Sequence, residues 1–226
     1  MNRYKYWYPS TLTLLNLALG FVAILLNHPV YSLLLILIGC FLDVFDGILA
    51  RLLKATSAFG KELDSLADIV TFGVAPAFLV YQHCLDHTVL NLLLVTLLPG
   101  FSAIRLAKFN NDGSQKSNFA GLPTPANGLF FASMPYLFQT TAITVAYLLP
   151  LILLFCILMV SPLRMFAFKD VGKGGPNTFF PLLFLVIVLI ASFFLSLSVI
   201  PAGVIVYILL SVVYHLFVNR TQLKSV

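Results

Sequence analysis

The chain has 226 residues, of which 60% are hydrophobic and only 9% are charged, and its mean hydropathy is +1.01. This composition excludes an ordinary water-soluble globular domain, in which about a quarter of the residues are charged, and it indicates a chain whose solvent is the lipid bilayer. The net charge of +5 is the one feature that would suit a nucleic-acid partner, and we expect no such partner.

Apolar stretches of about 20 residues, the length that an α-helix needs to cross the hydrocarbon core, follow one another along the chain. Backbone polar groups in lipid must pair within the protein, and continuous apolar runs favour helices. The first stretch has no small-x-small cleavage site and is expected to be retained. With short connections, the pattern predicts an all-α integral membrane protein with one domain over residues 1–226. The eight predicted spans are residues 10–26, 30–52, 63–83, 88–107, 124–139, 141–161, 177–197 and 199–218.

Every basic residue falls on one side of this predicted bundle. The 13 Lys and Arg residues lie before the first span, in the second-to-third, fourth-to-fifth and sixth-to-seventh connections, and in the C-terminal tail. The connections near residues 27–29, 83–88, 140 and 198–200 contain none. Because cytoplasmic loops of membrane proteins are enriched in Lys and Arg, we predict that both termini are cytoplasmic.

The acidic residues are concentrated in one short region, DVFDGILARLLKATSAFGKELDSLAD, at residues 43–68, which holds five of the eight carboxylates. Successive residues of a helix are rotated by about 100°. Asp43 and Asp46 therefore share one face of the second predicted helix, beside the small residues Gly47 and Ala50. Small side chains there leave room for a ligand to approach the helix backbone.

The third predicted helix repeats this arrangement. Gly60, Asp64 and Asp68 lie on one of its faces, again toward the end that we place in the cytoplasm. Because the connection between the two helices is short, the helices should be antiparallel neighbours. Their four Asp side chains are then predicted to converge on one cavity.

Four carboxylates in such a cavity need positive charge, because even one ionised Asp at bilayer depth costs several kcal/mol. Arg51 and Lys61 are too few and too close to the interface to supply it. Ligands that are all oxygen suit Mg²⁺, Mn²⁺ or Ca²⁺. Four carboxylates can hold two such ions, an arrangement that clamps a phosphoryl group in transfer. The alternative is a proton or ion pathway, since transporters also keep acids inside helix bundles.

The acids and their small neighbours form the pattern D-x2-D-G-x2-A-R-x8-G-x3-D-x3-D. This pattern resembles the signature of the CDP-alcohol phosphatidyltransferase family. All eight fixed positions match, and they are Asp43, Asp46, Gly47, Ala50, Arg51, Gly60, Asp64 and Asp68. The segments at residues 13–21, 60–77, 105–110, 119–126 and 161–169 are similar to the version of the family found in bacterial and archaeal phosphatidylserine synthases. One departure is Pro9-Ser10, where related sequences often have Pro-Asn.

The resemblance implies a role for each acid. Members of the family displace CMP from a CDP-linked lipid or alcohol with a hydroxyl acceptor, and they use divalent metal. Carried over, Asp43, Asp46 and Asp64 are metal ligands. Asp68 is the general base that takes the proton of the acceptor hydroxyl, and it also contacts metal. The expected cofactor is Mg²⁺ or Mn²⁺, as two ions.

The resemblance also suggests a nucleotide site. Gly47, Ala50 and Gly60 would make space for the cytidine nucleotide, and Arg51 would contact phosphate or else extend toward lipid headgroups. Two polar residues of the first helix, Thr13 and Asn16, are candidates for nucleotide contact, with hydrogen bonding between helices as the alternative.

A serine acceptor carries a carboxylate, which a cation should receive. Arg105 and Arg164 are the candidates, because Arg is the better bidentate partner of a carboxylate. The alternative is that both charges serve only to orient the protein in the membrane.

The expected reaction is therefore transfer of the phosphatidyl group from CDP-diacylglycerol to L-serine, at the cytoplasmic leaflet, with release of CMP. A second hypothesis keeps the chemistry but uses glycerol 3-phosphate or an inositol phosphate as acceptor. A third is a cation or proton transporter built on the Asp cavity. Family members are commonly homodimers, so the resemblance also implies a second copy of the chain as partner.

Overall fold

The structure is a computed structural model that describes residues 7–111, 119–141, 145–166 and 176–223. Across these residues the chain forms helical rods that follow the predicted apolar stretches in order. The rods are α1 (Trp7–Leu26); α2 (Pro29–Leu52); α3 (Ala58–Asp68) continued by the π-helix η2 (Ile69–Val74) and α4 (Ala75–Cys84); α5 (Val89–Val95) with α6 (Leu97–Asn111); α7 (Thr124–Thr140); α8 (Val145–Val160); α9 (Pro176–Leu195); and the 3₁₀ turn η5 (Ser196–Ser198) with α10 (Val199–Leu223).

Five of these rods are long and apolar enough to cross a membrane. They comprise residues Pro9–Leu26, Pro29–Leu52, Ala58–Cys84, Val89–Asn111 and Ser196–Phe217. The helices at Ala146–Val160 and Thr178–Ser192 are apolar but shorter. The protein is thus an all-α integral membrane protein, as its composition predicts. The predicted sixth span also includes residues 142–144, which lie outside the described residues.

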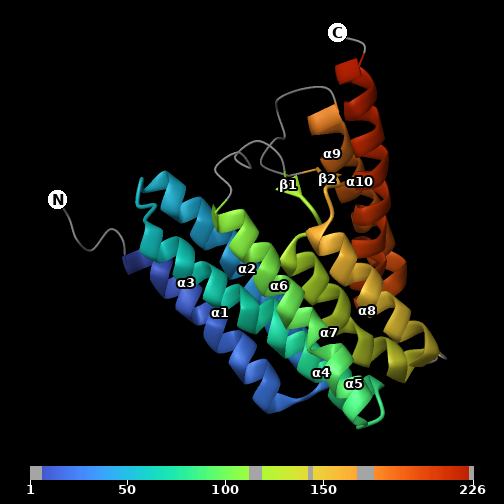
Figure 1. The fold of residues 1–226 in the computed structure, drawn as a ribbon. Coiled ribbons are helices and arrows are strands. Elements are labelled where there is room, and N and C mark those ends of the chain that lie inside the picture. Colours follow the sequence, from blue (N-terminus) through green and yellow to red (C-terminus); the bar gives the residue numbers. More distant parts are fainter. Residues whose placement is uncertain (1–6, 112–118, 142–144, 167–175, 224–226) are drawn as a thin grey trace.

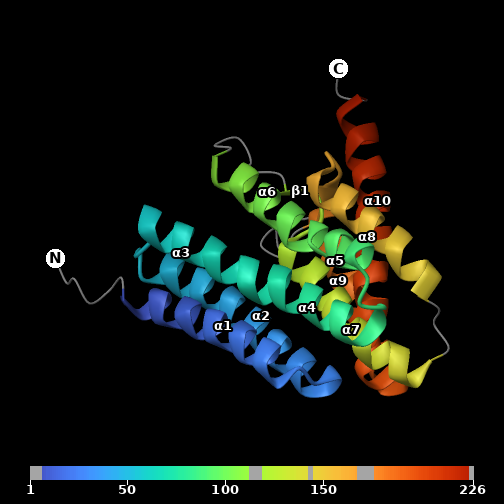
Figure 2. The ribbon, with the colours of Figure 1, turned by 60° about the horizontal axis from the view of Figure 1, so that its bottom comes forward.

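Helices α1, α2 and the α3–α4 rod run side by side, and α9 and α10 stand together at the opposite edge (Figures 1 and 2). In Figure 1 the start of α1 and the α2–α3 connection lie at the left, and α6 and α10 run upward to their ends. These are the ends next to which the sequence places basic residues. The fold thus separates the connections that carry Lys and Arg from those that carry none.

The turn between α2 and α3 sets how the acidic helices meet. Helix α2 ends at Leu52, and Lys54 then takes a left-handed conformation, with φ of 49°. Ser57 caps α3, because its hydroxyl accepts a 3.0 Å hydrogen bond from the backbone N–H of Gly60. A side-chain cap of this kind satisfies a backbone donor that the first turn leaves free. The cap begins α3 at a defined residue and so fixes the phase of its acidic face.

The π-helix η2 follows Asp68 directly, and glycines of neighbouring helices pack closely against it. A methyl group added at Gly39 of α2 would lie 2.7 Å from Asn16 Oδ1 and 3.0 Å from Thr71 Cγ2. One added at Gly128 of α7 would lie 2.7 Å from the Cα of Phe72. Small residues let membrane helices approach closely. Here they let α1, α2 and α7 pack against η2, the segment that follows Asp68.

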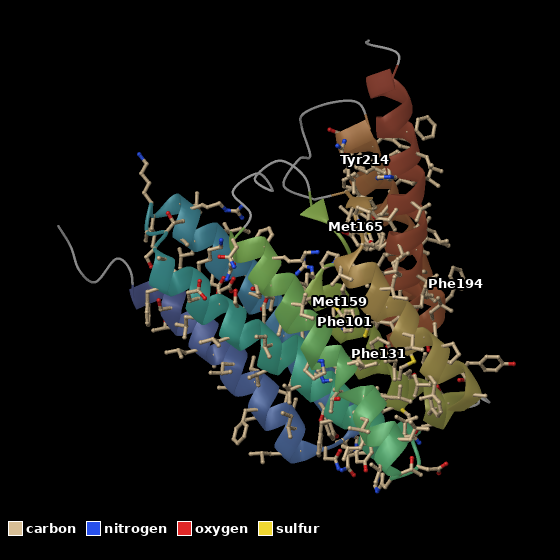
Figure 3. All side chains as sticks on the ribbon, in the orientation of Figure 1. Phe101, Phe131, Met159, Met165, Phe194 and Tyr214 are labelled. Atoms are coloured by element: carbon tan, nitrogen blue, oxygen red, sulfur yellow. The ribbon has the colours of Figure 1, made fainter. Side chains whose placement is uncertain are left out.

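The main hydrophobic core lies between α4, α6, α7, α8 and α10. Figure 3 shows Phe101, Phe131 and Met159 gathered in the middle of the bundle, from α6, α7 and α8. Phe194 of α9 lies at the outer edge of the bundle and is 82% exposed, as a lipid-facing side chain would be. The core therefore lies on one side of the acidic residues of α2 and α3, and α1 packs on the other side.

Candidate active site

A cavity of about 1260 Å³ opens between α2, the end of α6, α7, α9 and α10. Its polar end is lined by Asp43, Asp46 and Asp64, with Arg51 and Lys61 at the rim. Its other walls are largely apolar, and they include Leu37, Ala126, Leu129, Phe184, Val188, Ile200 and Val204. A cavity with a charged end and apolar walls suits a molecule with a polar head and hydrocarbon tails.

Three carboxylates form a cluster, of which Asp43 and Asp64 line the polar end of the cavity while Asp68 lies outside its described lining. One oxygen each from Asp43, Asp64 and Asp68 lies within 4.8 Å of the other two. Asp68 is only 6% exposed, and the other two side chains are half-buried. The two helices therefore aim these aspartates at one point, as the helical spacing predicts.

Asp46 is not one of the three clustered acids. Its Oδ2 accepts a 2.7 Å hydrogen bond from the hydroxyl of Thr13 on α1, and its side chain is 5% exposed. It lines the same cavity as Asp43 and Asp64. Thr13 therefore makes the contact between helices that the sequence left as the alternative to nucleotide binding, and it does so at the edge of the site.

A second cavity of about 440 Å³ lies between α1, the end of α2 and the start of α3. It is lined by Thr13, Gly47, Ala50, Gly60 and Lys61, among other residues. A methyl group added at Gly47 would meet no atom within 4 Å, so this glycine borders open space. Asp46, Gly47, Thr56, Lys61 and Asp64 line both cavities. The two cavities therefore join beside the acids, and the small residues of the signature surround the smaller one.

The donors in the cluster fit a divalent cation. Asp64 Oδ1 and Asp68 Oδ1 are buried and accept no hydrogen bond from any described residue. Such oxygens are costly to bury unless they are paired, and like charges this close repel one another. A set made only of carboxylate oxygens suits hard cations such as Mg²⁺ and Mn²⁺. Asp43, Asp64 and Asp68 are thus placed to hold a metal, with Asp46 beside them.

Arg105 lies behind the acids on α6. It is 8% exposed, and its Nη1 donates a 2.8 Å hydrogen bond to the hydroxyl of Thr124, at the start of α7. Its charge is close enough to attract both Asp43 and Asp68. Its Nε is buried and has no hydrogen-bond partner among the described residues. Sequence reasoning selected Arg105 as a cation near the mouth, and the structure buries it, with the charges of Asp68 and Asp43 acting on it.

Arg164 and Arg51 occupy different places. Arg164 lies in the two-residue strand β2 (Arg164–Met165), which pairs with β1 (Phe119–Ala120), and its backbone N–H donates to Nδ1 of His215 on α10. It is absent from the described lining of the large cavity. Arg51 lines that cavity, and its Nε donates to the carbonyl of Gly47 at 2.9 Å. Arg51 thus lines the large cavity, and the charges of Asp43 and Asp68 act on Arg105, but both Arg105 and Arg164 lie outside the described lining of that cavity.

Asn16 is fully buried between α1, α2 and η2, next to Gly39. Its side-chain amide has no partner among the described residues, and its carbonyl accepts a 2.9 Å hydrogen bond from Thr71. It lines neither cavity. Asn16 therefore contributes to the contact between α1, α2 and η2, outside both cavities.

Sequence reasoning gave no role to Thr124 or Asn127, which lie one turn apart on α7. Asn127 is 1% exposed, and both polar atoms of its amide lack a partner among the described residues. The signal available was the segment GLPTPAN at residues 121–127, where a proline at the start of a helix precedes two polar residues in an apolar span.

This geometry has a counterpart among known proteins. Residues 6–167 match the family model described as CDP-alcohol phosphatidyltransferase. The chain belongs to the CDP-alcohol phosphatidyltransferase family. That family consists of transferases and generally uses divalent metal, in agreement with the cluster of Asp43, Asp64 and Asp68.

Several members of the family are close in sequence. The CDP-diacylglycerol–serine O-phosphatidyltransferase of Bacillus subtilis is 40% identical over 136 residues, which are 58% of this chain and 76% of the relative. The enzyme with the same name in Methanocaldococcus jannaschii is 36% identical over 203 residues, 87% of this chain and 92% of the relative. The archaetidylserine synthase of Methanothermobacter thermautotrophicus is 35% identical over 130 residues, 55% of this chain and 56% of the relative.

Proposed function

We propose that this protein is a metal-dependent transferase that moves the phosphatidyl group of CDP-diacylglycerol to the hydroxyl of L-serine and releases CMP. One observation carries the proposal: Asp43, Asp64 and Asp68 form a carboxylate cluster, of which Asp64 lines both a small cavity bordered by signature residues and a large cavity with apolar walls. The names of the family relatives from Bacillus subtilis and Methanocaldococcus jannaschii describe the same reaction.

The two cavities divide the donor substrate between them. The cytidine nucleotide occupies the smaller one, against Gly47, Ala50 and Gly60, where a larger side chain would fill the space. The diacylglycerol tails lie along the apolar walls formed by α7, α9 and α10 and leave sideways into the bilayer. The diphosphate then crosses the junction beside the acids, which places the bond to be broken at the carboxylate cluster.

Asp43, Asp46 and Asp64, with Asp68, hold the cofactor, which we propose is a pair of Mg²⁺ or Mn²⁺ ions. When bound, the metal neutralises the diphosphate and stabilises the charge that develops on departing CMP. Thr13 holds Asp46 in place through its 2.7 Å hydrogen bond. The protein contributes fixed ligands, so that little reorganisation is needed as charge develops.

Asp68 is the general base. A serine hydroxyl is a weak nucleophile at neutral pH, and a carboxylate within hydrogen-bond reach removes its proton during attack. Asp68 lies deepest of the clustered acids and is 6% exposed, so water does not compete for it. Arg105 receives the serine carboxylate and is favoured over Arg164, because the charges of Asp43 and Asp68 act on Arg105 and its Nε has no partner among the described residues.

The membrane arrangement follows from the charges. We propose eight spans with both termini in the cytoplasm, because the helix ends next to basic residues lie on one side of the fold. The acids are at that side of α2 and α3, so the active site faces the cytoplasm, where serine and CDP are soluble. The family resemblance further supports a homodimer.

An acceptor panel tests the reaction. Purified protein is incubated with CDP-diacylglycerol, Mg²⁺ or Mn²⁺, and one of L-serine, glycerol 3-phosphate or an inositol phosphate. The proposal expects CMP release that is fastest with L-serine and a product that co-migrates with phosphatidylserine. Faster release with a phosphorylated alcohol would assign a different acceptor. Absence of CMP with every acceptor, together with cation flux into liposomes, would point to transport through the Asp cavity.

A further inference from the structure

Lys61 lies at the candidate active site, and the proposed reaction gives it no role. It is the residue after the signature glycine Gly60, and it lines both the smaller and the larger cavity. The residues with which it shares this position are Asp46, Gly47, Thr56 and Asp64. Among the described residues, Lys61 is thus the basic residue that lines both cavities.

The side chain of Lys61 spans the mouth of the site. Its Nζ donates a 2.8 Å hydrogen bond to the carbonyl of Asn110, at the end of α6, and lies 5.6 Å from the centre of the Phe109 ring. Both partners are uncharged. An ammonium group has three donors, so the bond to Asn110 leaves two of them for a ligand.

A small network holds Lys61 in this position. The side-chain amide of Asn110 donates to the hydroxyl of Ser65 at 2.9 Å, and that hydroxyl donates to the carbonyl of Lys61 at 3.1 Å. Ser65 lies one turn after Lys61 on α3. The end of α6 is therefore tied to α3 at two points, which limits the positions that the Lys61 ammonium can reach.

We propose that Lys61 binds a phosphate oxygen of the CDP group at the junction and stabilises the charge that forms on departing CMP. This inference rests on the proposed function, which threads the diphosphate through the junction. Lysine is an effective phosphate ligand because it supplies a point charge with several donors. The base Asp68 lies two turns further along the same rod, on the side from which serine attacks, so Lys61 faces the leaving group and not the acceptor.

The neutral partners explain how Lys61 changes contacts. Without nucleotide, its charge is shared between a backbone carbonyl and an aromatic face. A phosphate is a stronger partner for an ammonium than either of these, because the hydrogen bond is charge-assisted on both sides. Binding of CDP therefore moves the ammonium from Asn110 toward the junction, while the bond between Asn110 and Ser65 keeps α6 in place.

The test is the affinity for CDP, measured calorimetrically on the full-length protein in detergent with excess Mg²⁺. Lys61→Gln is expected to raise the Kd for CDP by about tenfold or more, since one charge-assisted contact is lost. Lys61→Arg keeps the charge and should stay within about threefold of wild type. Lys54→Gln is the matched control, because Lys54 is exposed, lies seven residues earlier and lines neither cavity.

A second variant separates phosphate binding from a merely structural role. Ser65→Ala removes one of the two links between α3 and Asn110 but leaves the ammonium, so the proposal expects wild-type affinity for CDP. Equal losses in Ser65→Ala and Lys61→Gln would show that Lys61 only fastens α6, and wild-type affinity in Lys61→Gln would also overturn the proposal. Either result would leave serine-dependent CMP release by the wild-type protein untouched, so it would not count against the reaction itself.

Discussion

The hydroxyl of Thr13 on α1 donates a 2.7 Å hydrogen bond to Oδ2 of Asp46 on α2, where both side chains are almost fully buried. Asp46 belongs to the signature, yet its carboxylate stands outside the group formed by Asp43, Asp64 and Asp68. The bond to Thr13 ties it to α1 at the edge of the smaller cavity. The orientation of this proposed metal ligand therefore depends on a helix that carries no acid.

Thr13→Val is predicted to lower kcat/KM for CDP-diacylglycerol by about tenfold, the loss expected when one hydrogen bond to a charged group is removed. The half-saturating Mg²⁺ concentration should rise as well, because Asp46 is no longer held. Thr13→Ser keeps the hydroxyl and should retain most of the activity. Initial rates of CMP release at varied Mg²⁺ measure both effects. An unchanged metal requirement in Thr13→Val would show that Asp46 needs no support from α1.

Asp68→Asn is predicted to separate binding from chemistry. The amide cannot take the proton of the serine hydroxyl, so turnover should fall by at least about a hundredfold, within the usual contribution of a general base. CDP affinity should change by only a few-fold, because Asp43, Asp46 and Asp64 remain. The matched control is Glu62→Gln, which removes an exposed carboxylate from the same helix. If CDP binding disappeared together with turnover, Asp68 would be chiefly a metal ligand.

The acidic face was predictable from the sequence because helical geometry is local. Spacings of three and four residues place Asp43 with Asp46 and Asp64 with Asp68 on single faces, and the short connection makes the two helices neighbours. The convergence of Asp43, Asp64 and Asp68 follows from those facts. The helical rods were predictable for a similar reason, since a bilayer demands long apolar helices.

The rest depends on contacts between distant segments. The π-helix after Asp68 leaves no clear periodic signal, and it forms where Gly39 and Gly128 allow close packing. Arg105 and Arg164 look alike in the sequence as basic residues near helix ends. The pairing of β2 with β1 and the bond from Arg105 to Thr124 join residues far apart in the sequence, so neither could be predicted from local patterns.

Arg105→Gln is predicted to weaken serine binding selectively. The KM for L-serine should rise by about tenfold or more, as a charge-assisted contact with the carboxylate is lost. Serinol, which has the hydroxyl and amine but no carboxylate, should lose much less. Lys108→Gln, on an exposed position of the same helix, serves as the control. Equal losses with serine and serinol would mean that Arg105 instead balances the charge of Asp43 and Asp68.

Metal removal is predicted to abolish CMP release and to lower the thermal midpoint of the folded protein. Chelation leaves Asp43, Asp64 and Asp68 as unpaired like charges within 4.8 Å of one another. Adding Mg²⁺ or Mn²⁺ should restore activity and raise the midpoint by several degrees, since a ligand that binds only the folded state stabilises it. The double variant Asp43→Asn, Asp64→Asn should be inactive, and its midpoint should not respond to metal. A metal response that persists in this variant would place the ion elsewhere.

Gly47→Leu is predicted to block the nucleotide site without disturbing the fold. A Cβ at position 47 would meet no atom within 4 Å, and Gly47 borders both cavities, so a leucine side chain has open space to enter. Leucine also suits a helix better than glycine does. The same side chain projects where the two cavities join, and it would occupy the space that CDP needs. The Kd for CDP should rise by more than about thirtyfold, which corresponds to about 2 kcal/mol, while the thermal midpoint stays at or above that of wild type. Gly100→Leu is the matched control, because Gly100 also borders open space but lines neither cavity. Normal CDP binding by a folded Gly47→Leu variant would place the nucleotide outside both cavities.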